Sequence, residues 1–354
     1  MERYIGLDAH SQTCTFAVMG PSGRRLREQV VETNGKQLVD FVKSIAGRKR
    51  LCMEEGTHSE WLYELLKPHV DELIVVQPAR REGHKSDSID AWALAEQIRK
   101  GGSVGTRVFK APGTYSELRA AVRAHRVLVG DLVRAKNRLK AIYRSRGLQG
   151  MGTEVYDAAE RDKWLKKLPA HRRKLAMVLS SELDAVAEVH EMAESWLREQ
   201  AGRCAAVKLL ATAPGIGLIR AAQIVAIVVS PERFRTRQQF WSYCGLGVVT
   251  RSSSDWARDR RGDWVRRETS QTRGLNRNRH PLLKSIFKGA ALNVVQSMPK
   301  HPLHQDYQRM ISAGIKPTLA RITVARKIAS AVLAMWKNKE EYDPAKSQTK
   351  PHAA

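Results

Sequence analysis

Four acidic residues in the first hundred positions have the types and spacing of a metal-binding carboxylate site. Asp8 and Glu54 each end a short apolar run, whereas Asp87 and Asp90 lie in the segment HKSDSIDAWALAEQIRK. The i, i+3 spacing places Asp87 and Asp90 on one face at the start of an expected helix, with Ser86 as a candidate N-cap. An acid that follows a buried strand lies at the end of a sheet, where α/β folds build their sites. Carboxylates that converge there repel one another unless they share divalent cations, so the four acids predict a site for Mg²⁺ or Mn²⁺ and phosphoryl-transfer chemistry.

Two alternatives remain open for these acids. Strand-end acids and helix-start aspartates are commonly solvated caps, so each acid taken alone favours a structural interpretation. Leu51 and Met53 are expected to point to the same, buried face of the strand. Glu54 would then point to the opposite face, and Glu55 to the same face as Leu51 and Met53. This pattern does not choose between the two glutamates. The order of hairpin, helix and strand, with acids at the ends of two strands and at the start of a later helix, is what favours metal-dependent nuclease chemistry.

A second candidate site is the serine segment 252–254, which follows Arg251. A serine hydroxyl can attack a phosphodiester when a base takes its proton and guanidinium groups hold the phosphate oxygens. Residues 251–288 contain eleven cations and four acids. The candidates for phosphate binding are Arg251, Arg258, Arg260 and Arg261. Serine-rich loops are more often turns or phosphate contacts than nucleophiles, so the pattern alone supports phosphate binding more than catalysis.

A third feature is the motif Pro214-Gly215-Ile216-Gly217 between two apolar segments. Glycine allows a tight turn whose backbone N–H groups can contact a phosphate without reading sequence, and Gly215 and Gly217 are the candidates for that contact. A plain helix–helix turn explains the same residues equally well.

The composition is consistent with a nucleic-acid partner. The 354 residues include 61 Lys+Arg and 36 Asp+Glu, which gives a formal charge of +25. Such a surplus predicts a polyanionic partner, although a merely basic protein is the alternative. The four cysteines are widely spaced, which argues against a disulfide scaffold or zinc ribbon and favours a reducing compartment, hence the cytoplasm. No apolar run reaches the roughly 18 residues of a membrane helix, so no membrane partner is expected.

The elements that must position these residues fall into four expected segments. Residues 1–115 alternate strands and helices and predict an α/β domain. Residues 116–200 predict two long helices, over 116–146 and 155–199, that form either an antiparallel coiled-coil arm or an ordinary bundle. Residues 201–340 predict a mainly α-helical domain, and 341–354 a disordered tail. The cations of the first long helix that are expected to bind nucleic acid are Arg119, Arg123, Arg126, Arg134, Lys136 and Arg138.

The chain resembles the DEDD transposases of bacterial insertion sequences, from about residue 3 to residue 338, in six motifs: IGLDAH, CMEEGTHSEWL, KSDSIDAWALAEQIR, APGIGLIRAAQIVAIV, FWSYCGLGVVTRSSSD and ARKIASAVLAMW. The resemblance implies an N-terminal RuvC-like domain with an RNase H fold and a C-terminal transposase domain. It makes Asp8 the first acid, and Asp87 and Asp90 the third and fourth.

Two assignments in this resemblance depart from the usual family pattern. The second family acid usually stands three residues before Gly-Thr, whereas here both glutamates directly precede Gly56. The resemblance favours Glu54. The family's nucleophilic serine follows a Gly-Leu pair by seven residues, which identifies Ser253. Its neighbours Ser252 and Ser254 remain alternatives, because the loop lacks the commoner proline.

The resemblance also implies a mechanism and partners. Such recombinases bind Mg²⁺ with the four acids, complete the site with a serine from another subunit, and link that serine covalently to DNA. Strand exchange passes through a Holliday-junction-like intermediate, and a structured bridge RNA pairs with donor and target DNA. The long helices would then assemble a dimer or tetramer in the bacterial cytoplasm, at the nucleoid. The alternatives are a RuvC-type nuclease or junction resolvase that uses water, and a non-catalytic DNA- or RNA-binding protein.

Overall fold

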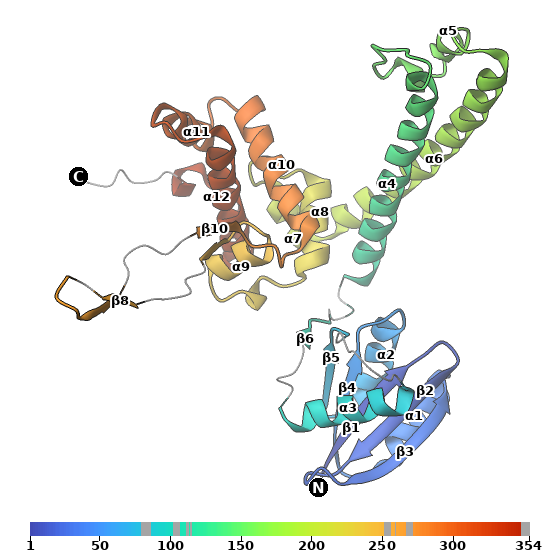
Figure 1. The fold of residues 1–354 in the computed structure, drawn as a ribbon, viewed down its shortest axis with the longest axis vertical. Helices are drawn as coiled ribbons and strands as arrows, with labels where there is room; N and C mark the ends of the chain where they lie inside the picture. Colours follow the sequence, from blue (N-terminus) through green and yellow to red (C-terminus); the bar gives the residue numbers. More distant parts are fainter. Residues whose placement is uncertain are drawn as a thin grey trace. The chain divides into compact units, whose positions relative to one another are not determined.

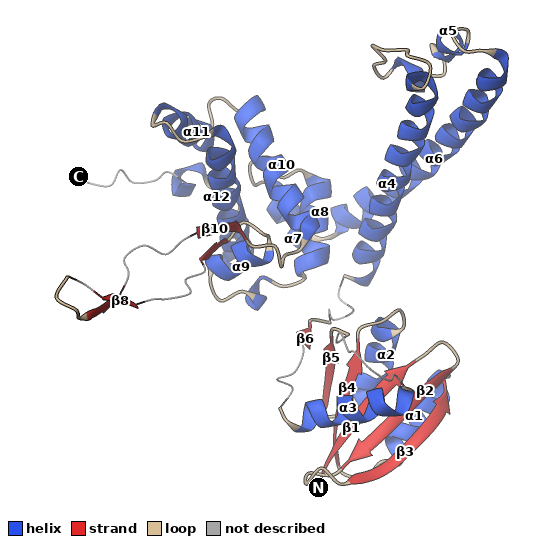
Figure 2. Ribbon diagram, viewed as in Figure 1, coloured by secondary structure: helices blue, strands red, loops and turns tan. Residues whose placement is uncertain are grey.

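The computed structural model describes residues 1–78, 86–101, 107–110, 113, 115–250, 256–258, 260–266 and 272–347. The chain divides into two compact units, Met1–Pro112 and Gly113–Ala354, and each is described by itself. Figure 1 shows the fold, and Figure 2 shows that the first unit is mixed α/β and the second largely helical. The predicted α/β fold followed by helices is therefore confirmed.

The first unit is built on a six-stranded sheet in the order β3-β2-β1-β4-β5-β6. Its strands are β1 (Glu2–Ala9), β2 (Thr13–Met19), β3 (Arg25–Glu32), β4 (Arg48–Glu54), β5 (Glu72–Val76) and β6 (Arg107–Val108). Strands β1 to β3 form an antiparallel meander, whereas β4 runs parallel to β1 and β5 parallel to β4. Because parallel strands end at the same edge, this topology brings the ends of β1 and β4 together.

Helices cover both faces of this sheet. α1 (Gly35–Ser44) and α2 (Ser59–Leu66) share an apolar core with Leu7 and Met53, whereas α3 (Asp87–Arg99) packs on the opposite face with Tyr4 and Cys52. Successive side chains of a strand point to opposite faces. Odd positions of β1 and β4 therefore face α1 and α2, and even positions, including Asp8 and Glu54, face α3.

The second unit begins with a helical hairpin, the arm, made of α4 (Ser116–Arg144) and α6 (Ala170–Arg203) (Figure 1). The expected second helix over 155–199 was wrong at its start. A short 3₁₀ turn, Glu154–Tyr156, and α5 (Arg161–Leu165) come first, and α6 begins after Pro169. The proline ring disfavours helical geometry in the preceding residue and fits only the first turn of a helix, which explains the boundary.

Helix α6 carries two apolar stripes rather than one. The stripe that faces α4 contains small or buried residues: Ala176, Ser180, Leu183, Leu197 and Ala201. A second stripe, the outer stripe, is exposed: Leu175, Val178, Val189, Met192 and Trp196. The two stripes have nearly the same three- and four-residue spacing, and only packing against α4 distinguishes them.

The rest of the second unit packs six helices around one core. They are α7 (Ala205–Ala211), α8 (Leu218–Val228), α9 (Arg237–Tyr243), α10 (Pro281–Ser297), α11 (Pro302–Ser312) and α12 (Pro317–Asn338). Two small sheets pair β7 (Val248–Thr250) with β10 (Thr272–Leu275) and β8 (Trp256–Arg258) with β9 (Trp264–Arg266). In the expected tail, Tyr342 stacks on His301 and a 3₁₀ turn follows at Pro344–Ser347; residues 348–354 lie outside the described part. No helix in the described ranges has the length and apolarity of a membrane span.

Candidate active site

The close approach of α3 to β1 brings Asp87 near Asp8, whereas Glu54 and Asp90 are not part of the same close group. A Cβ atom at Gly6 would lie 2.6 Å from the backbone nitrogen of Ala95 and closer still to the carbonyl oxygen of Ala91. Only glycine therefore lets the helix rest directly on the strand. Ser86 caps α3 by accepting a hydrogen bond from the backbone N–H of Ile89 at 3.3 Å, so the helix begins at Asp87 as the sequence predicted.

The carboxylates of Asp8 and Asp87 both lie close to His10, which follows the end of β1. Nε2 of His10 lies 3.1 Å from Oδ2 of Asp8 and 3.3 Å from Oδ1 of Asp87. One ligand atom from each of these three residues lies within 4.8 Å of the other two. No role was predicted for His10, although its place two residues after a strand-end acid is an available signal.

The electrostatics of Asp8 are those of a crowded carboxylate. Burial raises the pKa of Asp8, the nearby His10 lowers it, and the charges of Asp87 and Asp90 raise it; the net shift is upward. The fourth predicted acid, Asp90, thus acts on Asp8 from the first turn of α3. A group whose ionised form is disfavoured in this way is a good ligand for a cation, because the cation relieves the repulsion.

The register of the sheet supports Glu54 over Glu55 as the second acid. Leu7 pairs with Met53 in the parallel β1–β4 ladder, so Asp8 and Glu54 are the next residues on the two strands and share the α3 face. The group within 4.8 Å does not include the Glu54 side chain. Glu55 is engaged elsewhere: its Oε2 lies 2.6 Å from Nζ of Lys110, which donates to Oγ of Ser59 at 2.8 Å.

These residues fit a divalent cation. Asp8 and Asp87 offer the oxygen atoms that Mg²⁺ and Mn²⁺ prefer. Glu54 is on the face of the sheet that α3 covers, and Asp90 is in the first turn of α3. His10 would add a nitrogen ligand, which Mn²⁺ accepts more readily than Mg²⁺.

Arg251 and the three candidate serines, Ser252, Ser253 and Ser254, lie outside the described residues. The stem of this segment is described: Thr250, which precedes it, pairs with Thr272, and Val248 pairs with Leu275. Nε of Arg326 donates to the carbonyl oxygen of Leu246 at 2.7 Å and anchors the stem to α12.

The predicted phosphate-binding arginines beyond the serines lie on the β8–β9 hairpin. The Arg258 guanidinium lies 5.3 Å from the ring centroid of Trp264, its partner in the ladder. Arg260 and Arg261 are exposed in the turn between the two strands. Their contact with phosphate stays a prediction.

The turn at residues 214–217 packs closely against α10 in the helical core. Gly215 has a φ of +71°, and a Cβ there would lie 2.5 Å from the carbonyl oxygen of Ala290 in α10. Nη1 of Arg220 donates to the Gly215 carbonyl at 2.7 Å. Gly217 is exposed at the N-terminus of α8 and has no atom near its missing Cβ. Packing thus explains Gly215, while a phosphate contact of this turn stays a prediction.

The cations of α4 are partly used within the arm. Arg134 pairs with Asp131, Arg138 pairs with Glu182 of α6, and Nζ of Lys136 lies 5.3 Å from the ring centroid of Tyr156. Arg123 and Arg126 are exposed, and Arg119 is half-buried. Intramolecular pairing therefore reduces the charge that this helix can offer to nucleic acid.

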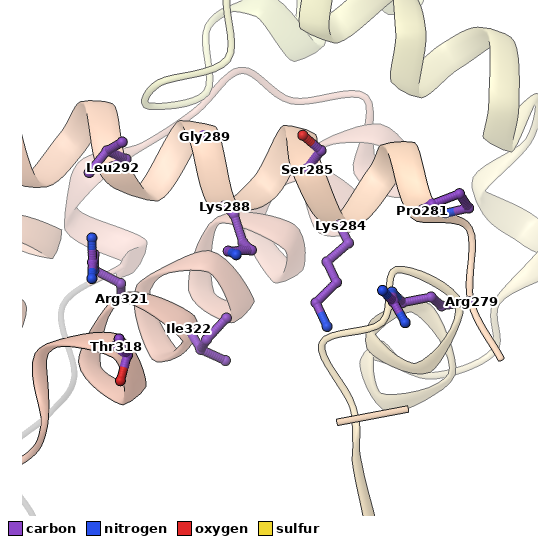
Figure 3. Close-up of a pocket in the computed structure, with 10 residues that line it drawn as sticks. All are labelled: Arg279, Pro281, Lys284, Ser285, Lys288, Gly289, Leu292, Thr318, Arg321 and Ile322. Carbon is purple, nitrogen blue, oxygen red and sulfur yellow. The ribbon is translucent and has the colours of Figure 1, made fainter. Parts of the chain in front are cut away.

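A cationic groove that was not predicted from the sequence lies between α10 and α12. It is a hollow of about 710 Å³ that is lined by Arg279, Pro281, Lys284, Ser285, Lys288, Gly289, Leu292, Thr318, Arg321 and Ile322, none of them acidic (Figure 3). Burial and the charges of Arg279 and Lys288 lower the pKa of Lys284, and Nε of Arg279 is buried without a hydrogen-bond partner. Crowded cations with an unused donor indicate a site for an anion such as a backbone phosphate.

The groove is physically tied to the stem of the serine segment. A Cβ at Gly245, which has a φ of +69°, would lie 2.9 Å from Cγ of Arg279. Arg279 therefore packs on the chain three residues before β7 and lines the groove at the same time.

Two family models match the chain. A DEDD transposase model of the IS110 type matches residues 5–145, from β1 to the end of α4. A model of the transposase IS116/IS110/IS902 family matches residues 207–308, from α7 into α11, which includes the serine segment and α10. Together they cover more than half of the chain. A search of curated proteins found no match.

Proposed function

The chain belongs to the IS110 family of DEDD transposases, and from this premise we propose that it cleaves and exchanges DNA strands with a carboxylate-bound metal and a serine nucleophile. The family makes DNA its partner. The residues of the mechanism, the bound ion and the guide are the proposal. The observation that carries it is the convergence of Asp8, His10 and Asp87 within 4.8 Å at the end of the sheet.

The acids are proposed to hold Mg²⁺, or Mn²⁺, against the scissile phosphate. When bound, the ion would polarise the phosphoryl oxygens and stabilise charge on the oxygens that attack and leave. Asp8 and Asp87 would supply its ligands, with Glu54 and Asp90 beside them on the α3 face. The raised pKa of Asp8 supports this role, because burial and the charges of Asp87 and Asp90 outweigh the lowering by His10, and a bound cation would relieve that cost.

Ser253 is proposed as the nucleophile, with Ser252 and Ser254 as its alternatives. Its hydroxyl oxygen would attack the phosphorus, so that a serine–phosphate ester forms and the bond from phosphorus to a deoxyribose oxygen breaks. The serine proton passes to a base, and the leaving deoxyribose oxygen takes up a proton. The reverse attack by a deoxyribose hydroxyl of the other strand releases the serine and completes the exchange. Arg251, Arg258, Arg260 and Arg261 would hold the phosphate oxygens.

The cationic groove is proposed to bind the backbone of DNA or of a structured bridge RNA that pairs with donor and target DNA. Lysine and arginine side chains can contact phosphates without reading bases, which leaves sequence choice to base pairing. The absence of acids among the residues of the groove supports this role. The exposed cations of α4, Arg123 and Arg126, would extend the nucleic-acid surface.

The outer stripe of α6 is proposed to assemble the protein into a dimer or tetramer. Its members include Met192, 67% exposed, and Val178, 61% exposed, spaced along one face of a 34-residue helix. Exposed apolar side chains on one face of a long helix favour burial against another helix. Assembly would let a serine from one subunit complete the acid site of another, in the cytoplasm at the nucleoid.

The test of the acid site compares two neighbouring glutamates. In a Mg²⁺-dependent cleavage assay with the element's noncoding RNA and DNA that carries its junction, Asp8→Asn, Asp87→Asn and Glu54→Gln should each lower the rate by at least about 100-fold. Glu55→Gln is the matched control, because Glu55 pairs with Lys110, and it should retain cleavage. Full activity in Asp8→Asn, or equal loss in both glutamate variants, would contradict the assignment.

A further inference from the structure

A second cluster of metal-binding side chains lies in the arm, between α4 and α6. His125 of α4 faces His190 and Glu194 of α6, which are separated by one helical turn. One ligand atom from each residue lies within 4.8 Å of the other two. Nε2 of His125 is 3.8 Å from Oε2 of Glu194, and the two imidazole rings are 5.2 Å apart between centroids.

The buried imidazole of His125 has few hydrogen-bond partners. Its side chain is 6% exposed, and its Nδ1 is buried without a hydrogen-bond partner. The 3.8 Å separation from Glu194 is longer than a hydrogen bond. A buried ring with so little hydrogen bonding is costly unless another group satisfies it. Burial and the charge of His190 lower the pKa of His125.

Glu194 is already oriented as a ligand. Its Oε1 accepts hydrogen bonds from Nε and Nη2 of Arg198, at 3.0 and 2.6 Å, one turn further along α6. These bonds hold the carboxylate and leave Oε2 toward His125. A carboxylate fixed by an outer partner is the usual arrangement around a bound metal.

We propose that His125, His190 and Glu194 bind a zinc-type transition-metal ion, with a water molecule as the fourth ligand. Two imidazoles and one carboxylate are a ligand set of Zn²⁺, whereas Mg²⁺ and Ca²⁺ prefer oxygen atoms alone. In a tetrahedral site with bonds near 2.1 Å, ligand atoms lie about 3.4 Å apart. Small side-chain rotations would close the present spacing to that value.

The position of the cluster suggests what the ion would do. Toward the base of the arm, Val122 and Leu197 belong to the large helical core; toward the tip, Ala135 and Leu183 belong to a separate core. The cluster lies between these two cores. An ion there would join α4 to α6 where apolar contacts are few, and would fix the arm that carries the outer stripe.

The test measures zinc binding by the full chain in an Asp8→Asn/Asp87→Asn background, which removes the other candidate cluster. We expect one Zn²⁺ per chain after gel filtration, and a Co²⁺ absorption spectrum of a tetrahedral nitrogen–oxygen site. His190→Gln, at a half-buried position, should weaken zinc binding at least about tenfold. Loss of a residue that only hydrogen-bonds to a metal ligand already weakens binding about tenfold or more, and loss of a ligand should weaken it at least as much. Zn²⁺ should raise the melting temperature of the background protein but not that of the His190→Gln variant.

His171→Gln is the matched control, because His171 is an exposed histidine on the same helix. It should bind zinc like its parent. Unchanged zinc binding in His190→Gln, equal loss in His171→Gln, or no zinc bound by the folded parent would each overturn the proposal. Circular dichroism of every variant checks that the helices are retained. Because the background lacks two of the DEDD acids, the result is independent of whether the proposed DNA cleavage is correct.

Discussion

Replacement of Gly6 by alanine should separate α3 from β1 and disrupt the acid site. The new Cβ would lie 2.6 Å from the backbone nitrogen of Ala95 and closer to the carbonyl oxygen of Ala91. Since ordinary contact begins near 3.5 Å, the helix must retreat by about 1 Å or more, and no flexible side chain can absorb the clash. Overpacking of this kind costs about 1–3 kcal/mol, which corresponds to a loss of roughly 5–15 °C in the melting temperature of a unit this size.

The same displacement should cost activity, because Asp87 and Asp90 move with α3 while Asp8 stays on β1. A misplacement of about 1 Å in a catalytic constellation can lower the rate about 100-fold. Thermal unfolding, hydrogen exchange over α3 and Mg²⁺-dependent cleavage together measure the effect. Gly20→Ala, directly after β2, is the control, since its nearest atom would be 3.6 Å from the new Cβ. Normal melting, protection of α3 and cleavage in Gly6→Ala would refute the reasoning.

Three further predictions follow from charge and exposure. Burial and neighbouring acids raise the pKa of Asp8, so its ionisation destabilises the folded state as pH rises from the ordinary carboxyl pKa through the raised value. Asp8→Asn should therefore have a higher melting temperature than wild type at pH 7 in EDTA, and this gain should disappear below the ordinary carboxyl pKa. Met192→Glu should reduce the mass measured by light scattering, because a charge replaces an exposed member of the outer stripe; an unchanged mass would argue against assembly there. Lys288→Gln with Arg321→Gln should reduce the salt dependence of DNA affinity by a slope of about 1.8, whereas the exposed Lys300→Gln outside the groove should not; equal effects would exclude a specific groove.

The positions of the candidate acids in the fold were largely predictable because their signals are local. Asp8 and Glu54 stand at strand ends, and the Ser86 cap with Asp87 and Asp90 defines the first turn of a helix. Alternation along the strands also placed Glu54 opposite the Leu51 face. The sequence could not show that α3 covers this opposite face.

The remaining features depend on packing between distant segments. The groove combines Arg279 with Lys284 and Lys288 of α10 and Arg321 of α12, and no local pattern relates them. In the arm, the inner and outer stripes of α6 have similar spacing, so the rotation of the helix against α4 decides which is buried. The pairing of His125 with His190 likewise depends on the register of the hairpin, which the sequence period does not fix.

The most direct test of the proposed mechanism is the capture of a serine–DNA ester. The full chain would be incubated with Mg²⁺, labelled junction DNA and the element's noncoding RNA, and then resolved on a denaturing gel, with mass spectrometry of the linked peptide. The proposal predicts an adduct on Ser253 that is absent in Ser253→Ala and in Asp8→Asn. Strand cleavage without any adduct by a protein with alanine at Ser252, Ser253 and Ser254 would contradict it and identify a nuclease that uses water.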